Sequence, residues 1–188
     1  MSSFTIRQAA VPDAPELAEF AARTFAETFA ADNTPEDIDA HLRAAYGVAQ
    51  QTAELKDRDV VTLVALRDEE LAGFAQVRQQ SAPSCVISER PIELHRFYLA
   101  RSAQGSGLAA PLMHAARASA QELGGLHMWL GVWERNPRAI AFYLKSGFVS
   151  VGSHVFMVGS DPQTDLVLVS PLSLLAVQEI IERMGIKP

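Results

Sequence analysis

The stretch that most constrains the fold runs from residue 93 to residue 117, where an apolar strand, a short polar loop and a helix follow one another. The loop contains Gly105 and Gly107. Glycine allows tight turns and lets a ligand approach the main chain, because it has no Cβ. The helix begins with about four N–H groups that lack intrahelical partners, and with a partial positive charge. These features predict either a plain tight turn or a site for an anion such as phosphate.

Two common phosphate-binding motifs are excluded by the residues that follow the glycines. No lysine follows Gly107, so the loop is not a P-loop of nucleotide triphosphatases. Leu108, Ala109 and Ala110 occupy the positions where a dinucleotide-binding fingerprint needs its third glycine.

Hydrophobic spacing predicts the elements on both sides of this stretch. The expected strands cover residues 4–8, 60–66, 71–77, 92–99, 128–133, 148–158 and 165–170, with an extension at 85–87 inside a loop. The expected helices cover residues 12–29, 35–46, 47–55, 108–123, 136–146 and 172–184. The last helix could pack on the domain or on a second subunit, as in a homodimer.

Composition indicates one soluble domain. The chain has 188 residues, of which 48% are apolar and 20% charged, so a single substantial core is expected. The net charge of −6 argues against non-specific binding to nucleic acid. No run approaches the roughly twenty apolar residues that span a membrane.

Cys85 is the only cysteine, which excludes an intrachain disulfide and suits a reducing compartment. The N-terminus has no apolar segment of signal-peptide length. We therefore expect a cytoplasmic protein. The five histidines show no clustered spacing, so no metal site is expected.

The glycine loop resembles the Arg/Gln-x-x-Gly-x-Gly/Ala motif of the GCN5-related N-acetyltransferases (GNAT), with Gln104, Gly107 and Ala109 at its fixed positions. A second stretch resembles the family's N-x-x-A-x-x-F-Y-x-x-x-G-F signature. The matching residues are Asn136, Ala139, Phe142, Tyr143, Gly147 and Phe148. The two motifs stand in the family's order, and the resemblance extends from the first strand to about residue 172.

The order of elements and the resemblance agree on the fold. We expect an α+β (α/β mixed) GNAT-like acyl-CoA N-acyltransferase fold, with a central twisted mixed sheet of about six to seven strands flanked by helices. Residues 1–188 would form one N-acetyltransferase domain, with a core at 4–172 and a C-terminal helix at 173–188.

The resemblance implies transfer of an acetyl group from acetyl-CoA to a primary amine. The backbone of Phe97, Tyr98 and Leu99 would pair with the pantetheine arm, and the N–H of Leu99 would face the oxyanion. The pyrophosphate would lie on the loop formed by Gln104, Gly105, Ser106, Gly107, Leu108 and Ala109.

The second motif supplies two further candidates. Tyr143 has the place of the family's general acid, which protonates the leaving thiolate; a phenol with a pKa of about 10 suits that task. Asn136 would bond to the coenzyme's arm. Without the resemblance, Tyr143 is equally a core aromatic residue and Asn136 a helix cap.

The general base is less well defined. Strand alternation places Glu93 and His95 on the face that carries Phe97 and Leu99. Glu93 is the first candidate, with a pKa raised by burial or acting through a water, and His95 is the second. A solvated glutamate and a structural histidine remain the alternative, with no dedicated base.

The acceptor is a small amine in this interpretation. Residues 24–36 and 155–172 look similar to PaiA-type polyamine acetyltransferases. The acidic side chains between the first two strands could receive an ammonium group; they are Glu27, Asp32, Glu36 and Asp37. Two other functions stay open, a non-catalytic acyl-CoA sensor and an enzyme that acetylates protein N-termini or lysines.

Overall fold

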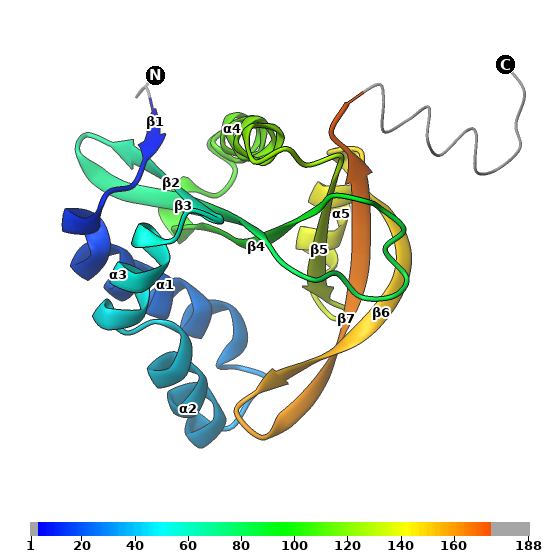
Figure 1. Cartoon of the computed structure of the whole chain (residues 1–188). Helices are drawn as coiled ribbons and strands as arrows, with labels where there is room; N and C mark the ends of the chain where they lie inside the picture. Colours follow the sequence, from blue (N-terminus) through cyan, green and yellow to red (C-terminus); the bar gives the residue numbers. More distant parts are fainter. Residues whose placement is uncertain (1–3, 174–188) are drawn as a thin grey trace, which may run out of the picture.

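The computed structural model describes residues 4–173, which form one sheet with helices on both faces (Figure 1). The strands are β1 Thr5–Gln8, β2 Val60–Arg67, β3 Glu70–Gln79, β4 Pro91–Leu99, β5 His127–Trp133, β6 Val149–Val158 and β7 Asp161–Pro171. The α-helices are α1 Ala14–Phe29, α2 Pro35–Ala45, α3 Val48–Lys56, α4 Ala109–Glu122 and α5 Pro137–Lys145. Short 3₁₀ turns lie at Val11–Asp13 and Arg101–Ala103.

The sheet has seven strands in the order β1-β2-β3-β4-β5-β7-β6. Every neighbouring pair is antiparallel except β4 and β5, which are parallel and joined through α4. The predicted α+β class and mixed sheet are confirmed, with the strand number at the upper end of the expected range.

Two cores lie on opposite faces of the sheet. On one face, α4 and α5 pack through residues such as Leu112, Ala116 and Tyr143. On the other face, α1 packs through Leu17 and Phe25 against the first half of the sheet. Figure 1 shows α4 on the opposite side of the sheet from α1, α2 and α3.

Local signals explain most element boundaries. The Thr34 side chain accepts from the backbone N–H of Asp37 at 3.2 Å, which caps α2 as its sequence predicts. The β2–β3 hairpin turns through Asp68 and Glu69, whose φ angles are 50° and 68°. Two residues with positive φ give a hairpin turn whose twist matches that of the strands.

Three expectations need comment. β7 begins at Asp161 instead of residue 165, because its first residues pair with β6 alone before β5 joins at Asp165. Residues 85–87 form no strand, although Val86 is buried against Trp129. The expected C-terminal helix lies outside the described residues. Within residues 4–173, each helix is too short or too polar to cross a lipid bilayer.

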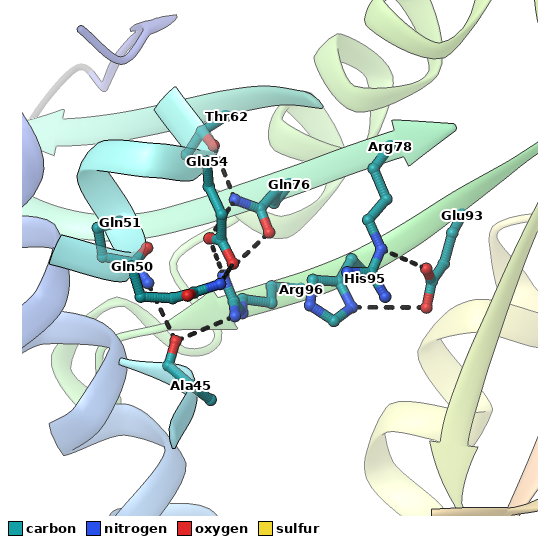
Figure 2. A network of polar contacts seen from close by, with 10 residues as sticks. All are labelled: Ala45, Gln50, Gln51, Glu54, Thr62, Gln76, Arg78, Glu93, His95 and Arg96. Carbon is teal, nitrogen blue, oxygen red and sulfur yellow. Dashed lines mark hydrogen bonds and ion pairs between the residues drawn. The ribbon is translucent and has the colours of Figure 1, made fainter. Parts of the chain in front are cut away.

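A buried ion pair ties α3 to the middle of the sheet (Figure 2). Arg96 on β4 is 5% exposed and binds the carboxylate of Glu54 on α3. The guanidinium also donates to Gln76 Oε1 at 3.0 Å and to the Ala45 carbonyl at 3.2 Å. Gln76 Nε2 in turn donates to Glu54 and to Thr62 Oγ1, each at 3.0 Å. Removing one partner of such a pair typically costs roughly 3–5 kcal/mol, since the other charge stays buried.

Candidate active site

β4 and β5 part soon after they begin. They pair only at residues 91–93 of β4 and 127–129 of β5, and beyond Glu93 the two strands diverge. The edge of β4 that faces β5 is therefore left open over its second half. An open strand edge offers N–H and C=O groups to an extended ligand.

Backbone alternation shows which groups face this gap. The N–H of Ala100 donates to the Ala72 carbonyl at 2.9 Å, which sets the hydrogen-bonded positions between β4 and β3. In an antiparallel ladder the intervening residues direct their N–H and C=O groups away from the partner. Those residues are Phe97 and Leu99, so their backbone groups point into the gap, where the resemblance placed the pantetheine arm.

A β-bulge at His95 changes which side chains of β4 lie on each face of the sheet. Gln76 pairs with Arg96 while Val77 pairs with Leu94, so His95 is an inserted residue. As a result Leu94 packs in the core under α4, whereas Arg96 reaches α3 on the other face.

The bulge corrects a prediction about the base. Glu93 is paired with Arg78 and lies on the face that carries Arg96. Phe97 and Leu99 pack against the core under α4. The prediction that Glu93 shares a face with Phe97 and Leu99 is therefore wrong, because simple alternation does not hold across an inserted residue.

A cavity of about 1070 Å³ opens from the gap. One end reaches the glycine loop and the start of α5, and the other reaches the ends of α1 and α2 and the β6–β7 hairpin. Predicted residues on its wall are Glu93, His95, Phe97, Tyr98, Leu99, Gln104, Gly105, Ala109, Asn136 and Tyr143.

The loop glycines are required for conformation. Gly105 and Gly107 have φ angles of 77° and 88°, in the left-handed region that favours glycine. A Cβ at either position would meet no atom within 4 Å, so space is not the constraint. Leu108 is fully buried, which anchors the loop, and α4 begins at Ala109 without a side-chain cap. Its first N–H groups are thus directed outward, as a phosphate site needs.

A basic side chain stands beside this loop. Arg138, from the first turn of α5, donates to the side-chain oxygen of Gln104. Both residues line the cavity. Ser106 donates its hydroxyl to the Ala103 carbonyl, so its side chain stabilises the turn. The loop and α5 together form the polar, cationic end of the cavity.

The second motif places Asn136 and Tyr143 on α5. The Asn136 side chain accepts from the N–H of Ala139 at 3.1 Å, which confirms the helix cap. Tyr143 is 9% exposed and contacts Phe97 and Phe148 edge to face. Burial raises the pKa of the Tyr143 phenol, so the group stays protonated at neutral pH.

Glu93, Arg78 and His95 form a chain of polar contacts on the other face (Figure 2). Arg78 Nε donates to Glu93 Oε2 at 2.6 Å, and His95 Nδ1 lies 3.4 Å from Glu93 Oε1. Burial alone would raise the pKa of Glu93, but its contacts with His95 and Arg78 outweigh burial and hold that pKa below its usual range. The expected raised pKa is not found. Burial lowers the pKa of His95, which favours the neutral imidazole.

Two further polar residues on the cavity wall were not predicted from the sequence. Asp165 on β7 and His154 on β6 are paired across the ladder, and both lean over Gly131 on β5. A Cβ on Gly131 would lie 2.7 Å from His154 Nε2 and 3.0 Å from Asp165 Oδ2. The glycine within the apolar run of β5 was the one available signal, because an isolated strand glycine often marks a close approach.

Of the acidic residues predicted to bind the acceptor, some line the cavity and others do not. Glu27 lines the cavity, but its carboxylate lies 3.7 Å from Arg101. Asp37 accepts from both the N–H and the hydroxyl of Ser160, at 2.7 and 2.8 Å, and so fastens α2 to the β6–β7 turn. Asp32 and Glu36 do not line the cavity. Among residues 4–173 no group of three acidic, histidine or cysteine side chains is placed to hold a metal ion.

Residues 17–148 match the acetyltransferase (GNAT) family. The chain belongs to the GNAT family of acetyltransferases. An uncharacterised N-acetyltransferase of Lactobacillus delbrueckii subsp. lactis is 32% identical over 168 residues, which cover 89% of this chain and 97% of that protein. An uncharacterised N-acetyltransferase of Mycobacterium tuberculosis is 36% identical over 160 residues, covering 85% and 98%. This GNAT protein is therefore an N-acetyltransferase.

A solved structure supports the same fold. The PaiA N-acetyltransferase of Thermoplasma acidophilum, crystallised with coenzyme A, superposes with a TM-score of 0.72 at 23% identity, covering 90% of this GNAT chain and 99% of the other. At that identity the similarity establishes the fold. The predicted family and enzyme class are confirmed.

Asp165 provides a test of how the site affects stability. Burial raises the pKa of Asp165 to about 6, so ionisation penalises the folded state. Wild type and Asp165→Asn should be equally stable below about pH 4, where the carboxyl is protonated in both the folded and the unfolded chain. Between about pH 4 and 6 the wild type should lose stability relative to the variant, by up to about 3 kcal/mol above pH 7. Urea unfolding at several pH values measures this; a constant difference across the pH range would contradict it.

Proposed function

We propose that the protein transfers an acetyl group from acetyl-CoA to the primary amine of a small molecule, by direct attack while both substrates are bound. The observation that carries this proposal is the open edge of β4, which ends at a glycine loop and a helix N-terminus. An extended arm with a phosphate group at one end fits such a site.

The residues fit the donor as follows. The backbone of Phe97 and Leu99 would pair with the pantetheine arm, and the Leu99 N–H would stabilise charge on the thioester oxygen. The loop at residues 104–109 would hold the pyrophosphate, with Arg138 close enough to add a positive charge. Holding the thioester beside the amine can itself contribute several kcal/mol to the rate.

Acid and base would act from opposite faces of the sheet. Tyr143 packs with the core under α4 and would protonate the leaving thiolate. His95 lines the cavity, and we assign it as the base in preference to Glu93. Glu93 is the poorer proton acceptor because its pKa is lowered. The Glu93 carboxylate beside His95 Nδ1 would favour the tautomer that leaves Nε2 free to accept a proton.

The acceptor side favours a small amine over a protein. The contact between Asp37 and Ser160 joins α2 to the β6–β7 turn, so that end of the cavity is bounded by both. PaiA and a spermidine N-acetyltransferase chimera, the latter with a TM-score of 0.63 at 20% identity, share the fold. These likenesses motivate polyamines as the first acceptors to test. A reducing compartment such as the cytoplasm suits the single cysteine, Cys85.

Titration calorimetry with acetyl-CoA, followed by spermidine and simpler amines in the same cell, tests the proposed function. Micromolar binding and then heat of turnover with one amine would support it. Binding without turnover on any small amine would favour an acyl-CoA sensor or an enzyme with a protein acceptor. Absence of binding would reduce the glycine loop to a structural turn and refute the proposal.

The Tyr143→Phe variant separates chemistry from binding. It removes the proton donor while keeping the ring contacts with Phe97 and Phe148, so kcat should fall about 10²–10⁴-fold. The dissociation constant for acetyl-CoA should change less than about threefold. Full activity of Tyr143→Phe would remove this residue from the mechanism.

Two substitutions distinguish the base from its partner. His95→Gln should lower kcat/KM about 10²-fold or more, because no group then accepts the amine proton. Glu93→Gln should lower it less and should move the acidic limb of the pH–rate profile to lower pH, because the Glu93 carboxylate raises the pKa of His95 and the variant lacks that charge. If Glu93→Gln were the more damaging change, Glu93 would be the base.

A further inference from the structure

The carboxylate of Asp165 is largely buried and lacks a close counter-charge. Its side chain is 12% exposed, and the His154 Nε2 atom lies 4.0 Å from its Oδ2 atom. No hydrogen bond to the Asp165 carboxylate is found within residues 4–173. Arg78, which also lines the cavity, is bound to Glu93. A buried charge without a partner is unfavourable, so this arrangement requires a reason.

Neighbouring polar groups on the same wall also lack partners. The indole Nε1 of Trp129 is buried and unpaired among the described residues, and Trp129 is 3% exposed. The Nε2 atom of His154 is likewise buried and without a hydrogen bond there. Both residues line the cavity with Asp165. Since buried polar groups usually have partners, the cavity wall around Asp165 is poor in hydrogen-bond partners from the protein.

Aromatic rings beside Asp165 indicate that the ligand group is a cation. Trp133 stands directly opposite Asp165 on the neighbouring strand. Phe29 lies 5.7 Å from the Trp133 ring, and Phe156 lines the same end of the cavity. The faces of aromatic rings attract ammonium groups, and a carboxylate attracts them more strongly. A cationic group gains from both the carboxylate and the rings, whereas an anionic group is repelled by the carboxylate.

We propose that Asp165 binds a second ammonium group of the acceptor, one that is not acetylated, and so makes the enzyme selective for diamines and longer polyamines over monoamines. This inference rests on the proposed function. The sheet order places β5 between β4, which carries His95, and β7, which carries Asp165. β7 lies one strand spacing from β5, and β4 diverges from β5 beyond Glu93, so the two side chains are separated by more than two regular spacings, or roughly 10 Å. That separation is too large for one amine to meet both side chains and suits an alkyl diamine.

Steady-state kinetics with saturating acetyl-CoA tests the proposal with two acceptors of equal chain length, 1,4-diaminobutane and butylamine. Wild type should prefer the diamine. Asp165→Asn should lower kcat/KM for 1,4-diaminobutane at least about tenfold, mainly through KM, because one charge-assisted contact is lost. The value for butylamine should stay within about twofold. Asp59→Asn makes the same change at an exposed position outside the cavity and should alter neither acceptor.

The remaining outcomes are distinguishable. Equal loss of kcat for both acceptors in Asp165→Asn would make Asp165 a catalytic group and would overturn its proposed role in binding the second ammonium group. An unchanged preference for the diamine would overturn it while leaving the proposed function intact. If wild type binds acetyl-CoA but acetylates neither these amines nor spermidine, the proposed function fails, and the proposed binding of a second ammonium group by Asp165 fails with it.

Discussion

The structure depends on the parting of β4 and β5. If the two strands were paired along their whole length, their backbone N–H and C=O groups would bond to each other and leave no room for a ligand between them. Here the pairing stops at Glu93, and the second half of β4 keeps a row of N–H and C=O groups facing a cavity. The glycine loop and α4 follow directly from that edge, so the groups that we propose to bind the donor lie along one continuous path in the chain.

The gap is maintained by strong interactions on both sides of it. On the β4 side, Arg96 is fixed by Glu54, Gln76 and a carbonyl of α2, which is possible only because the bulge at His95 turns Arg96 toward α3. On the β5 side, β7 pairs with β5 along its whole length. β4 is therefore fixed by β3 and α3, and β5 is fixed by β7, so β4 and β5 do not need to pair with each other beyond Glu93.

Much of this architecture could be predicted from the sequence, for identifiable reasons. Apolar periodicity located the elements, and the motifs at Gln104–Ala109 and Asn136–Phe148 gave the order of the donor-side parts. The glycines at 105 and 107 do adopt the φ values that only glycine tolerates readily. Caps such as Thr34 and Asn136 were visible because capping is a local interaction between residues three apart.

The acceptor side could not be predicted in the same way. One inserted residue at position 95 reverses the face of Glu93 relative to Phe97, and alternation cannot detect it. The partners Arg78 and His95, which lower the pKa of Glu93, depend on that register. Asp165 and His154 come together over Gly131 only after three strands have paired, so no local pattern marks them as a group.

The division of the cavity between its two ends has a consequence for evolution. The end proposed for the donor is built from residues within one segment, 93–143. The end proposed for the acceptor combines α1 and α2 with the β6–β7 hairpin, which the contact between Asp37 and Ser160 brings together. Insertions or substitutions in either of those outer segments can reshape the acceptor end and leave the glycine loop and the open edge of β4 unchanged. A descendant of this chain could thus become specific for a different acceptor while keeping the residues proposed to bind the donor.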